Sequence, residues 1–143
     1  VLSDRSVPDW DDAKTAAKVE KWRSICIESI KQCGSAWLPK LELPMTPKEA
    51  LADARQSALS LIATLQPDSK HPREHIDAHA AEHGLAPSKL AIWVGPEGDY
   101  TPAEINIIRT GALPITLGPL VLRSETAAIY CLAVLNYELQ ARQ

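Results

Sequence analysis

The spacing of apolar positions predicts that strands and helices alternate through the middle of the chain. Three apolar runs, at 57–65, 89–94 and 113–118, are too short for comfortable helices and predict strands buried on both faces. Helical patterns at 71–84 and 101–111 lie between them. Elements that alternate at this spacing predict an α/β fold with a parallel sheet and right-handed crossovers.

Helix start and stop signals define further boundaries. Apolar residues recur at helical spacing from about Asp11 to Cys33, and Gly34 follows at a position typical of a helix end, which predicts a long amphipathic helix. Thr46 and Thr101 each begin a Thr-Pro-x-Glu pattern, with a capping threonine, a proline at the first helical position and a glutamate that completes a capping box. Helices are therefore predicted directly after both threonines.

The last predicted helix, from about Ser124 to Ala141, differs from the others because it has almost no polar face. Positions 127–135 carry only alanine, isoleucine, tyrosine, cysteine, leucine and valine. A helix that is apolar all round must be covered on all sides, which one small sheet cannot do. We therefore expect a second subunit or another domain to cover it.

Length and charge limit the classes of function. With 143 residues and 45% hydrophobic content, the chain is too short for two domains of ordinary size, so residues 1–143 are predicted to form one domain. A net charge of -3 and a pI near 5.8 do not give the global basic field of most nucleic-acid binders. An RNA partner must then be recognised locally or through a part outside this sequence, and no DNA partner is expected.

Cysteine usage and hydropathy indicate a cytoplasmic protein. Cys26, Cys33 and Cys131 are an odd number without a Cys-x-x-Cys pair, which fits a reducing compartment and predicts buried, inert thiols. No run approaches the roughly 18 apolar residues of a membrane span, so no membrane partner is expected. The sequence begins at Val1 without methionine, which favours a processed chain or a fragment.

A loop follows each predicted strand at its carboxyl end, where ligands bind in open parallel sheets, and two of the three loops contain glycine. The loops come after Leu65, Val94 and Thr116, and they contain Gly95, Gly98 and Gly118. The pattern is neither the Gly-x-Gly-x-x-Gly of dinucleotide sites nor a phosphate-binding loop with Gly-Lys-Ser/Thr. The spacing alone leaves two interpretations open, tight structural turns and a ligand pocket.

Histidines and aromatic residues are better explained by structure than by chemistry. His71, His75, His79 and His83 recur every four residues on one predicted helix, but no carboxylate or cysteine cluster completes a metal site. A solvated histidine edge is therefore preferred and no metal is predicted. Tyr100, Trp93 and the other tryptophans are too scattered for a base-stacking platform and are assigned to core or interface packing.

Two stretches read together resemble a known family. “VGPEGDYTPAEI” followed by “LPITLGPLVLRSETAAIYCL” closely resembles the RsmE family of ribosomal RNA uridine-N3 methyltransferases, which belongs to the SPOUT superfamily of knotted methyltransferases. The upstream stretch “KWRSICIESIKQCGSAWLPKL” is also similar to the family, so the resemblance covers most of the chain. It implies a SPOUT-type parallel sheet flanked by helices, with a C-terminal deep trefoil knot, and a homodimer.

The resemblance also implies an S-adenosylmethionine site made by three loops, in which backbone amides and carbonyls read the adenine. Carried over residue by residue, the cofactor-binding positions are Leu65, Gln66, Val94, Gly95, Pro96, Glu97, Gly98, Leu117, Gly118, Leu122 and Arg123. Arg123 is the candidate for stabilising the deprotonated uracil, and Glu125 the candidate for orienting it. A role of Glu125 as base is a weaker alternative, and a purely electrostatic role at the helix N-terminus is another.

The chain departs from the family at three points. Asp99 stands where the family commonly has a second glycine, and Leu120 where it often has a basic residue. The family also carries a PUA-like RNA-binding domain and a first strand and helix before the segment matching “SDRSV”, so a fragment is expected.

The resulting hypothesis is methyl transfer to N3 of a uridine in small-subunit (16S) ribosomal RNA, with that RNA or the small ribosomal subunit as partner. Two alternatives stay open. One is a module that binds the cofactor or assembles as a dimer without independent catalysis, and the other is a SPOUT enzyme with a different RNA substrate.

Overall fold

The computed structural model describes residues 1–5 and 11–140, which fall into two compact units. The first unit contains the N-terminal segment 1–5 and the chain from Thr46 onward, and the second contains the described residues 11–45. Each unit is described by itself. Ala141, the predicted end of the last helix, lies outside the described residues.

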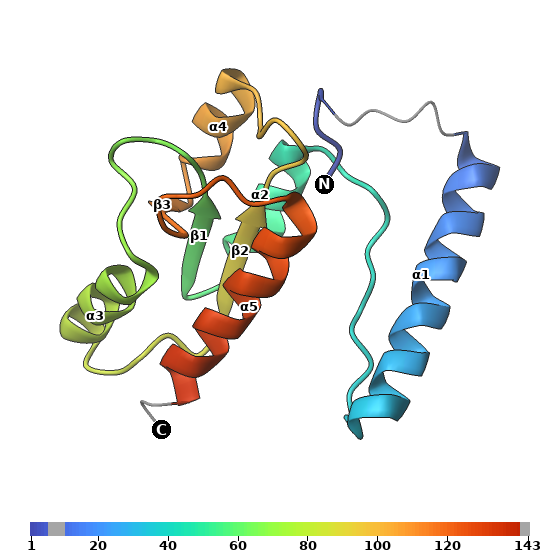
Figure 1. The fold of residues 1–143 in the computed structure, drawn as a ribbon, viewed down its shortest axis with the longest axis horizontal. Coiled ribbons are helices and arrows are strands. Elements are labelled where there is room, and N and C mark those ends of the chain that lie inside the picture. Colours follow the sequence, from blue (N-terminus) through green and yellow to red (C-terminus); the bar gives the residue numbers. More distant parts are fainter. Residues whose placement is uncertain (6–10, 141–143) are drawn as a thin grey trace. The chain divides into compact units, whose positions relative to one another are not determined.

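The first unit is built on a three-stranded parallel sheet (Figure 1). Its strands are β1 (Leu59–Ala63), β2 (Leu90–Val94) and β3 (Leu113–Ile115), in the order β2-β1-β3. Central Leu61 is paired with Ile92 on one side and Leu113 on the other. The parallel α/β sheet predicted from the sequence is confirmed, although each strand is shorter than the apolar run that predicted it.

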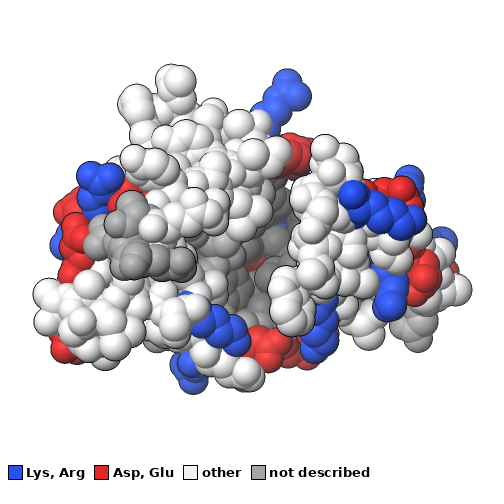
Figure 2. Space-filling model, turned by 90° about the horizontal axis from the view of Figure 1, so that it is seen from below, with Lys and Arg blue, Asp and Glu red and all other residues white. Residues whose placement is uncertain are grey.

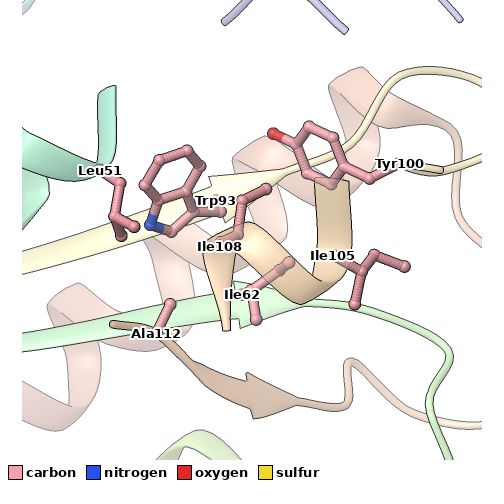
Figure 3. Close-up of a cluster of buried hydrophobic side chains, with 7 residues drawn as sticks. All are labelled: Leu51, Ile62, Trp93, Tyr100, Ile105, Ile108 and Ala112. Carbon is pink, nitrogen blue, oxygen red and sulfur yellow. The ribbon is translucent and has the colours of Figure 1, made fainter. Parts of the chain in front are cut away.

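Helices cover both faces of this sheet. On one face, α2 (Pro47–Ala54) and α4 (Pro102–Ile108) pack on side chains from β1 and β2. Figure 3 shows this cluster, which consists of Leu51, Ile62, Trp93, Tyr100, Ile105, Ile108 and Ala112. Trp93 donates from Nε1 to the Ser60 hydroxyl at 3.0 Å, so the indole is buried without an unpaired donor. The packing role predicted for Trp93 and Tyr100 is confirmed.

The other face is covered by α3 (Pro72–His83) and α5 (Ser124–Gln140). Because successive side chains of a strand alternate between faces, Leu59 and Leu61 point to this side, where they meet Ile76 of α3 and Cys131 of α5. Burial raises the pKa of the Cys131 thiol to about 11, so this thiol is inert as predicted. The sheet is thus buried on both faces, which explains its nearly continuous apolar strands.

A charged pair joins the two helices of this face, at a position of α5 beyond the apolar run 127–135. Arg73 of α3 donates from Nε and Nη2 to both oxygens of Glu138, at 2.7 to 3.0 Å. Glu138 is only 4% exposed, and the guanidinium satisfies it in the bidentate geometry that arginine favours. A buried carboxylate therefore interrupts the apolar surface of α5.

Local capping explains where the helices begin. The capping boxes predicted for Thr46 with Glu49 and for Thr101 with Glu104 are both present. His71 caps α3 in the same way, because its ring nitrogen Nδ1 accepts from the amide of Arg73 at 3.2 Å. Further along α3, the rings of His79 and His83 stack with centroids 4.2 Å apart.

The second unit consists of α1 (Asp12–Cys33) and the extended link that follows it. Asp11 caps the helix by accepting from the Lys14 amide at 2.8 Å, and Gly34 ends it in the left-handed conformation. Among residues 11 and 13–45, for which burial is described, none is buried, and Ile25 remains 55% exposed. The predicted helix is present, but its apolar stripe is not covered within the described structure.

The prediction of three buried thiols is wrong for two of them. Cys33 is exposed and Cys26 is only half-buried, because both lie on α1, which contributes no side chain to either core cluster. Trp37 is 84% exposed, so core packing is wrong for this tryptophan, and the alternative of interface packing stays a prediction. Among the described helices, none combines the length and apolar character needed to cross a membrane.

Candidate functional site

A cavity of about 530 Å³ lies at the carboxyl ends of the strands, within the first unit. Its wall comes from three places in the chain: the end of β1, the loop after β2, and the segment from Thr116 into the first turns of α5. The volume is within the range of about 300–1,000 Å³ that small-molecule sites occupy. The glycine loops identified in the sequence therefore surround a real cavity.

Most of the predicted cofactor residues line this cavity. They are Leu65, Gln66, Val94, Gly95, Pro96, Glu97, Gly98, Leu117, Leu122 and Arg123. The cavity wall does not include Gly118 or Glu125; Gly118 lies between wall residues, and Glu125 is exposed in the first turn of α5. The structure thus brings the three loops together but leaves the two candidate catalytic side chains in different surroundings, since only Arg123 is part of the wall.

Several wall residues were not predicted. Thr64 and Asp99 contribute from the first two loops, and Thr116, Val121 and Ser124 contribute from the third. Each lies within a few residues of a predicted position, so the sequence could have indicated these residues only through their place in the same loops. No motif singled out these five residues.

The loop after β2 makes its turn with two successive residues in the left-handed conformation. Gly98 has a φ of 87° and Asp99 a φ of 63°, and the Asp99 amide closes the turn on the Pro96 carbonyl at 2.9 Å. Asp99 is the one residue other than glycine with positive φ in the described chain. This conformation suits the second glycine that the resembling family commonly has at this position.

Asp99 is tolerated there because its side chain is held on both oxygens. Oδ1 accepts from the amide of Tyr100 at 2.7 Å, and Oδ2 accepts from the Thr64 hydroxyl at 3.4 Å. Aspartate is one of the few residues that enter this region, since its short side chain can bond locally to the backbone. The carboxylate also explains Gly95: a Cβ on Gly95 would lie 2.7 Å from Asp99 Oδ1.

The segment after β3 is held by fewer interactions. Thr116 Oγ1 accepts from the Gly118 amide at 3.2 Å and donates to the Gly118 carbonyl at 3.3 Å. Gly118 has a φ of 105°, and a Cβ on it would meet no atom within 4 Å. Leu120 and Val121 are more than 70% exposed, so this wall of the cavity has open space beside it.

The charges of the cavity wall are mixed. Glu97 and Asp99 contribute carboxylates and Arg123 a guanidinium. Behind the wall, burial raises the pKa of Tyr100 to about 12, and its hydroxyl donates to the Val94 carbonyl at 3.0 Å, so it serves as a neutral brace. On the face drawn in Figure 2, basic and acidic side chains form small interspersed groups among uncharged ones, with no broad region of one sign.

Metal ligands do not gather within the described residues: no group of three or more histidine, cysteine or acidic side chains lies close enough to hold an ion. The histidine edge of α3 is instead engaged in local contacts. His75 Nε2 pairs with the Pro114 carbonyl at 3.0 Å, and His83 Nδ1 with the His79 carbonyl at 3.1 Å.

A cavity at the carboxyl edge of a parallel sheet, walled by glycine loops, defines a small-molecule-binding α/β domain. A family model described as an RNA methyltransferase domain matches residues 1–136. The chain therefore belongs to the RNA methyltransferase domain family.

Curated relatives support the same assignment. The chain is 33% identical over 116 residues to the ribosomal RNA small subunit methyltransferase E of Mesomycoplasma hyopneumoniae, covering 80% of this chain and 47% of the relative. It is 31% identical over 137 residues to the protein of that name from Bacillus subtilis, covering 94% of this chain and 52% of the relative. The resemblance to the RsmE family is confirmed, and the chain spans about half the length of the relatives it matches.

Solved structures share the fold. A Legionella pneumophila protein described as a methyltransferase, in complex with the bound cofactor SAM, superposes with a TM-score of 0.82 at 34% identity, over 95% of this chain and 52% of the other. A ribosomal RNA small subunit methyltransferase E from Neisseria gonorrhoeae, bound to S-adenosyl methionine, has a TM-score of 0.73 at 23% identity, over 95% and 52% of the two chains. The second likeness shows the fold alone.

Proposed function

We propose that this chain is the catalytic part of an S-adenosylmethionine-dependent methyltransferase that modifies N3 of a uridine in small-subunit ribosomal RNA, in the cytoplasm. The observation that carries the proposal is the cavity at the carboxyl ends of β1 and β2, walled by three loops that include both glycine motifs. The names of the relatives and the cofactor-bound Legionella structure support it.

The residues of the cavity fit this cofactor. The volume of about 530 Å³ suits a nucleoside with an amino-acid arm. The open space beside Gly118 allows a flat ring to approach the backbone closely, which a side chain there would prevent. The cofactor supplies a methyl group on a sulfonium that is already reactive, so the protein has little covalent chemistry to perform.

The chain's own task is then to align the substrate and stabilise its charge. Arg123 is the one wall residue with a permanent positive charge, and we assign it to the uracil anion left when N3 loses its proton. Glu125 lies two residues further on, in the first turn of α5, and we assign it to orienting Arg123. No residue is assigned as general base.

The larger assembly is also part of the proposal. We propose that residues 1–143 form one domain whose C-terminal segment closes the trefoil knot of the SPOUT superfamily, and that two copies pair through α5. The support for pairing is the exposure of large apolar side chains on α5, with Ile129, Leu132 and Tyr137 all more than 60% exposed. Leu135, which the apolar pattern places on the same helix, belongs to the core instead.

A methyl-transfer assay tests the function. The chain, with tritiated S-adenosylmethionine, is incubated with small ribosomal subunits and with free ribosomal RNA, and the product is read by primer extension. A methyl group on N3 blocks the Watson–Crick edge, so a new stop at a uridine is expected, with Arg123→Ala reducing transfer at least tenfold. Cofactor binding without transfer to either substrate would favour a binding module, and a stop at another nucleotide would favour a different RNA methyltransferase.

Light scattering tests the pairing through α5. Leu132→Lys places a charge on the exposed apolar face, while Glu82→Lys places the same side chain at an exposed position of α3. We expect the unmodified chain and Glu82→Lys to be dimers and Leu132→Lys to be monomeric or insoluble. A monodisperse monomer of the unmodified chain at micromolar concentration would refute the pairing.

A further inference from the structure

Arg5, which no sequence motif singled out, reaches the glycine loop of the cavity. Its Nη1 group donates to the carbonyl of Gly98 and makes a longer contact with the carbonyl of Asp99, at 3.5 Å. A Cβ built on Gly98 has Arg5 Nη1 as its nearest neighbour, at 3.7 Å. The guanidinium therefore lies against the backbone of the loop that forms one wall of the proposed cofactor site.

A buried carboxylate holds the N-terminal segment in place for this contact. Ser3 donates from its hydroxyl to Glu104 Oε2 at 3.1 Å, and the Asp4 amide donates to Glu104 Oε1 at 2.9 Å. Glu104 is 5% exposed, and its Oε2 also accepts from the amide and hydroxyl of Thr101. One carboxylate thus ties the segment that carries Arg5 to the start of α4, directly after the loop that Arg5 contacts.

Arg5 contacts the carbonyl groups of this loop from outside the turn. Gly98 and Asp99 are both left-handed, and no backbone–backbone bond described for this turn engages the carbonyl of either residue. A non-glycine residue with positive φ persists only where its surroundings hold it there. A cationic donor on two successive carbonyls does this, because charge-assisted hydrogen bonds are about twice as strong as neutral ones.

We propose that Arg5 is a positioning residue for the cofactor: it fixes the left-handed turn at Gly98 and Asp99 and so sets the wall against which the cofactor binds. The inference rests on the proposed function for its ligand. It assigns to residues 3–5 a role in the site, although they lie more than ninety positions away from the loop in the sequence.

A positioning role of Arg5 can be distinguished from a role in the stability of the fold, because Arg5 is exposed and belongs to neither core cluster. Removing its side chain should leave the packed sheet and its melting temperature nearly unchanged. What should change is the mobility of the turn and the affinity of the cavity. Lysine keeps the charge and a donor but lacks the planar fork of arginine, so Arg5→Lys should restore part of the effect.

The experiment compares Arg5→Ala, Arg5→Lys and the control Arg55→Ala, an exposed arginine at the end of α2 that does not line the cavity. Amide hydrogen exchange without ligand measures the mobility of the turn at Gly98 and Asp99. Isothermal titration with S-adenosylmethionine measures the affinity of the chain for the cofactor. We expect Arg5→Ala to speed exchange at Asp99 and Tyr100 about tenfold and to weaken cofactor binding about tenfold, an effect of about 1.4 kcal/mol. Arg5→Lys should fall between, and Arg55→Ala should match the unmodified chain.

Two results would overturn the inference. One is unchanged exchange at Asp99 and Tyr100 in Arg5→Ala, and the other is unchanged affinity in that variant while the unmodified chain binds cofactor. Failure of the unmodified chain to bind is a different result, since it overturns the proposed function and with it the ligand assigned here. Ser3→Ala provides an independent check, because losing the anchor to Glu104 should speed exchange at the same two amides to a smaller extent.

Discussion

The loop after β2 and the segment after β3 wall the same cavity and both contain a left-handed glycine, yet they are supported very differently. The first is braced by Asp99, Thr64 and Arg5, and its turn is closed by its own backbone. The second relies on Thr116, with exposed Leu120 and Val121 beyond it. One wall is formed before any ligand arrives, whereas the other has room to adjust around it.

The largest effect on cofactor affinity should come from adding a side chain at Gly118, in the less supported segment after β3. Gly118→Val puts a β-branched side chain at a φ of 105°, where it is strained, between the wall residues Leu117 and Leu120. We expect cofactor affinity to fall by about 100-fold or more, about 2.8 kcal/mol, in isothermal titration.

Gly84→Val is the matched control, because Gly84 is also left-handed with open space around it but caps the end of α3 and does not line the cavity. Both variants should lose similar stability. If Gly84→Val weakened the cofactor equally, backbone strain rather than the open wall would explain the loss.

A change at Glu104, which anchors the segment that carries Arg5, should instead lower the stability of the fold. Burial alone would raise the pKa of Glu104, but hydrogen bonds from Thr101, Asp4 and Ser3 outweigh it, and the pKa lies below the ordinary 4.5. We expect Glu104→Gln to lower the free energy of unfolding by about 1–3 kcal/mol at pH 7, measured by urea denaturation.

The direction in which stability changes with pH follows from the lowered pKa of Glu104. The ionised carboxylate stabilises the fold above about pH 4.5, and this contribution is lost as the pH falls through the folded-state pKa. The difference between Glu104→Gln and the unmodified chain should therefore shrink below pH 4. Glu49, in the exposed capping box of α2, provides the comparison, and Glu49→Gln should have a smaller effect at every pH.

A smaller effect should distinguish two substitutions of Asp99. Asp99→Ala loses the local hydrogen bonds and keeps a Cβ at positive φ, whereas Asp99→Gly loses the same bonds without that strain. Thermal unfolding should therefore find the glycine variant more stable than the alanine variant by about 1 kcal/mol. Equal stability would mean that the turn relaxes out of the left-handed region when its carboxylate is removed.

The smallest effect should come from Thr116→Val, which removes the side-chain hydrogen bonds of the open wall while keeping its shape. Because the segment is exposed, the free energy of unfolding should change by less than about 0.5 kcal/mol. Exchange of the Gly118 amide should nevertheless become faster. A large loss of stability would show that the second wall is as firmly built as the first.

Features of the fold that depend on local sequence patterns could be predicted from the sequence. Capping boxes, buried strands and the loops that follow the strands are local patterns, so Thr46, Thr101 and the strand that contains Leu61 were predicted close to where they lie. The parallel sheet placed three of these loops at one edge. The ten predicted residues that line the cavity came from the resemblance to the RsmE family, carried over residue by residue.

Contacts between distant segments could not be predicted in that way. The bond from Ser3 to Glu104 and the pair between Arg73 and Glu138 join residues with no shared motif or spacing. The exposed cysteines of α1 were missed because an amphipathic pattern predicts which face is apolar but not whether that face becomes covered. The left-handed Asp99 was missed because aspartate has no strong preference that announces it.

The strand order β2-β1-β3 has a consequence for synthesis. Of the three described strands, the central one is synthesised first and can pair with β2 and β3 only after they emerge, and the last of them, β3, ends at Ile115. Parallel pairing between distant segments forms slowly, and an apolar strand with open edges is a site of aggregation in the meantime. Within this sheet, the sequence Leu-Ser-Leu-Ile-Ala is therefore the segment that we expect to be most prone to aggregation during synthesis.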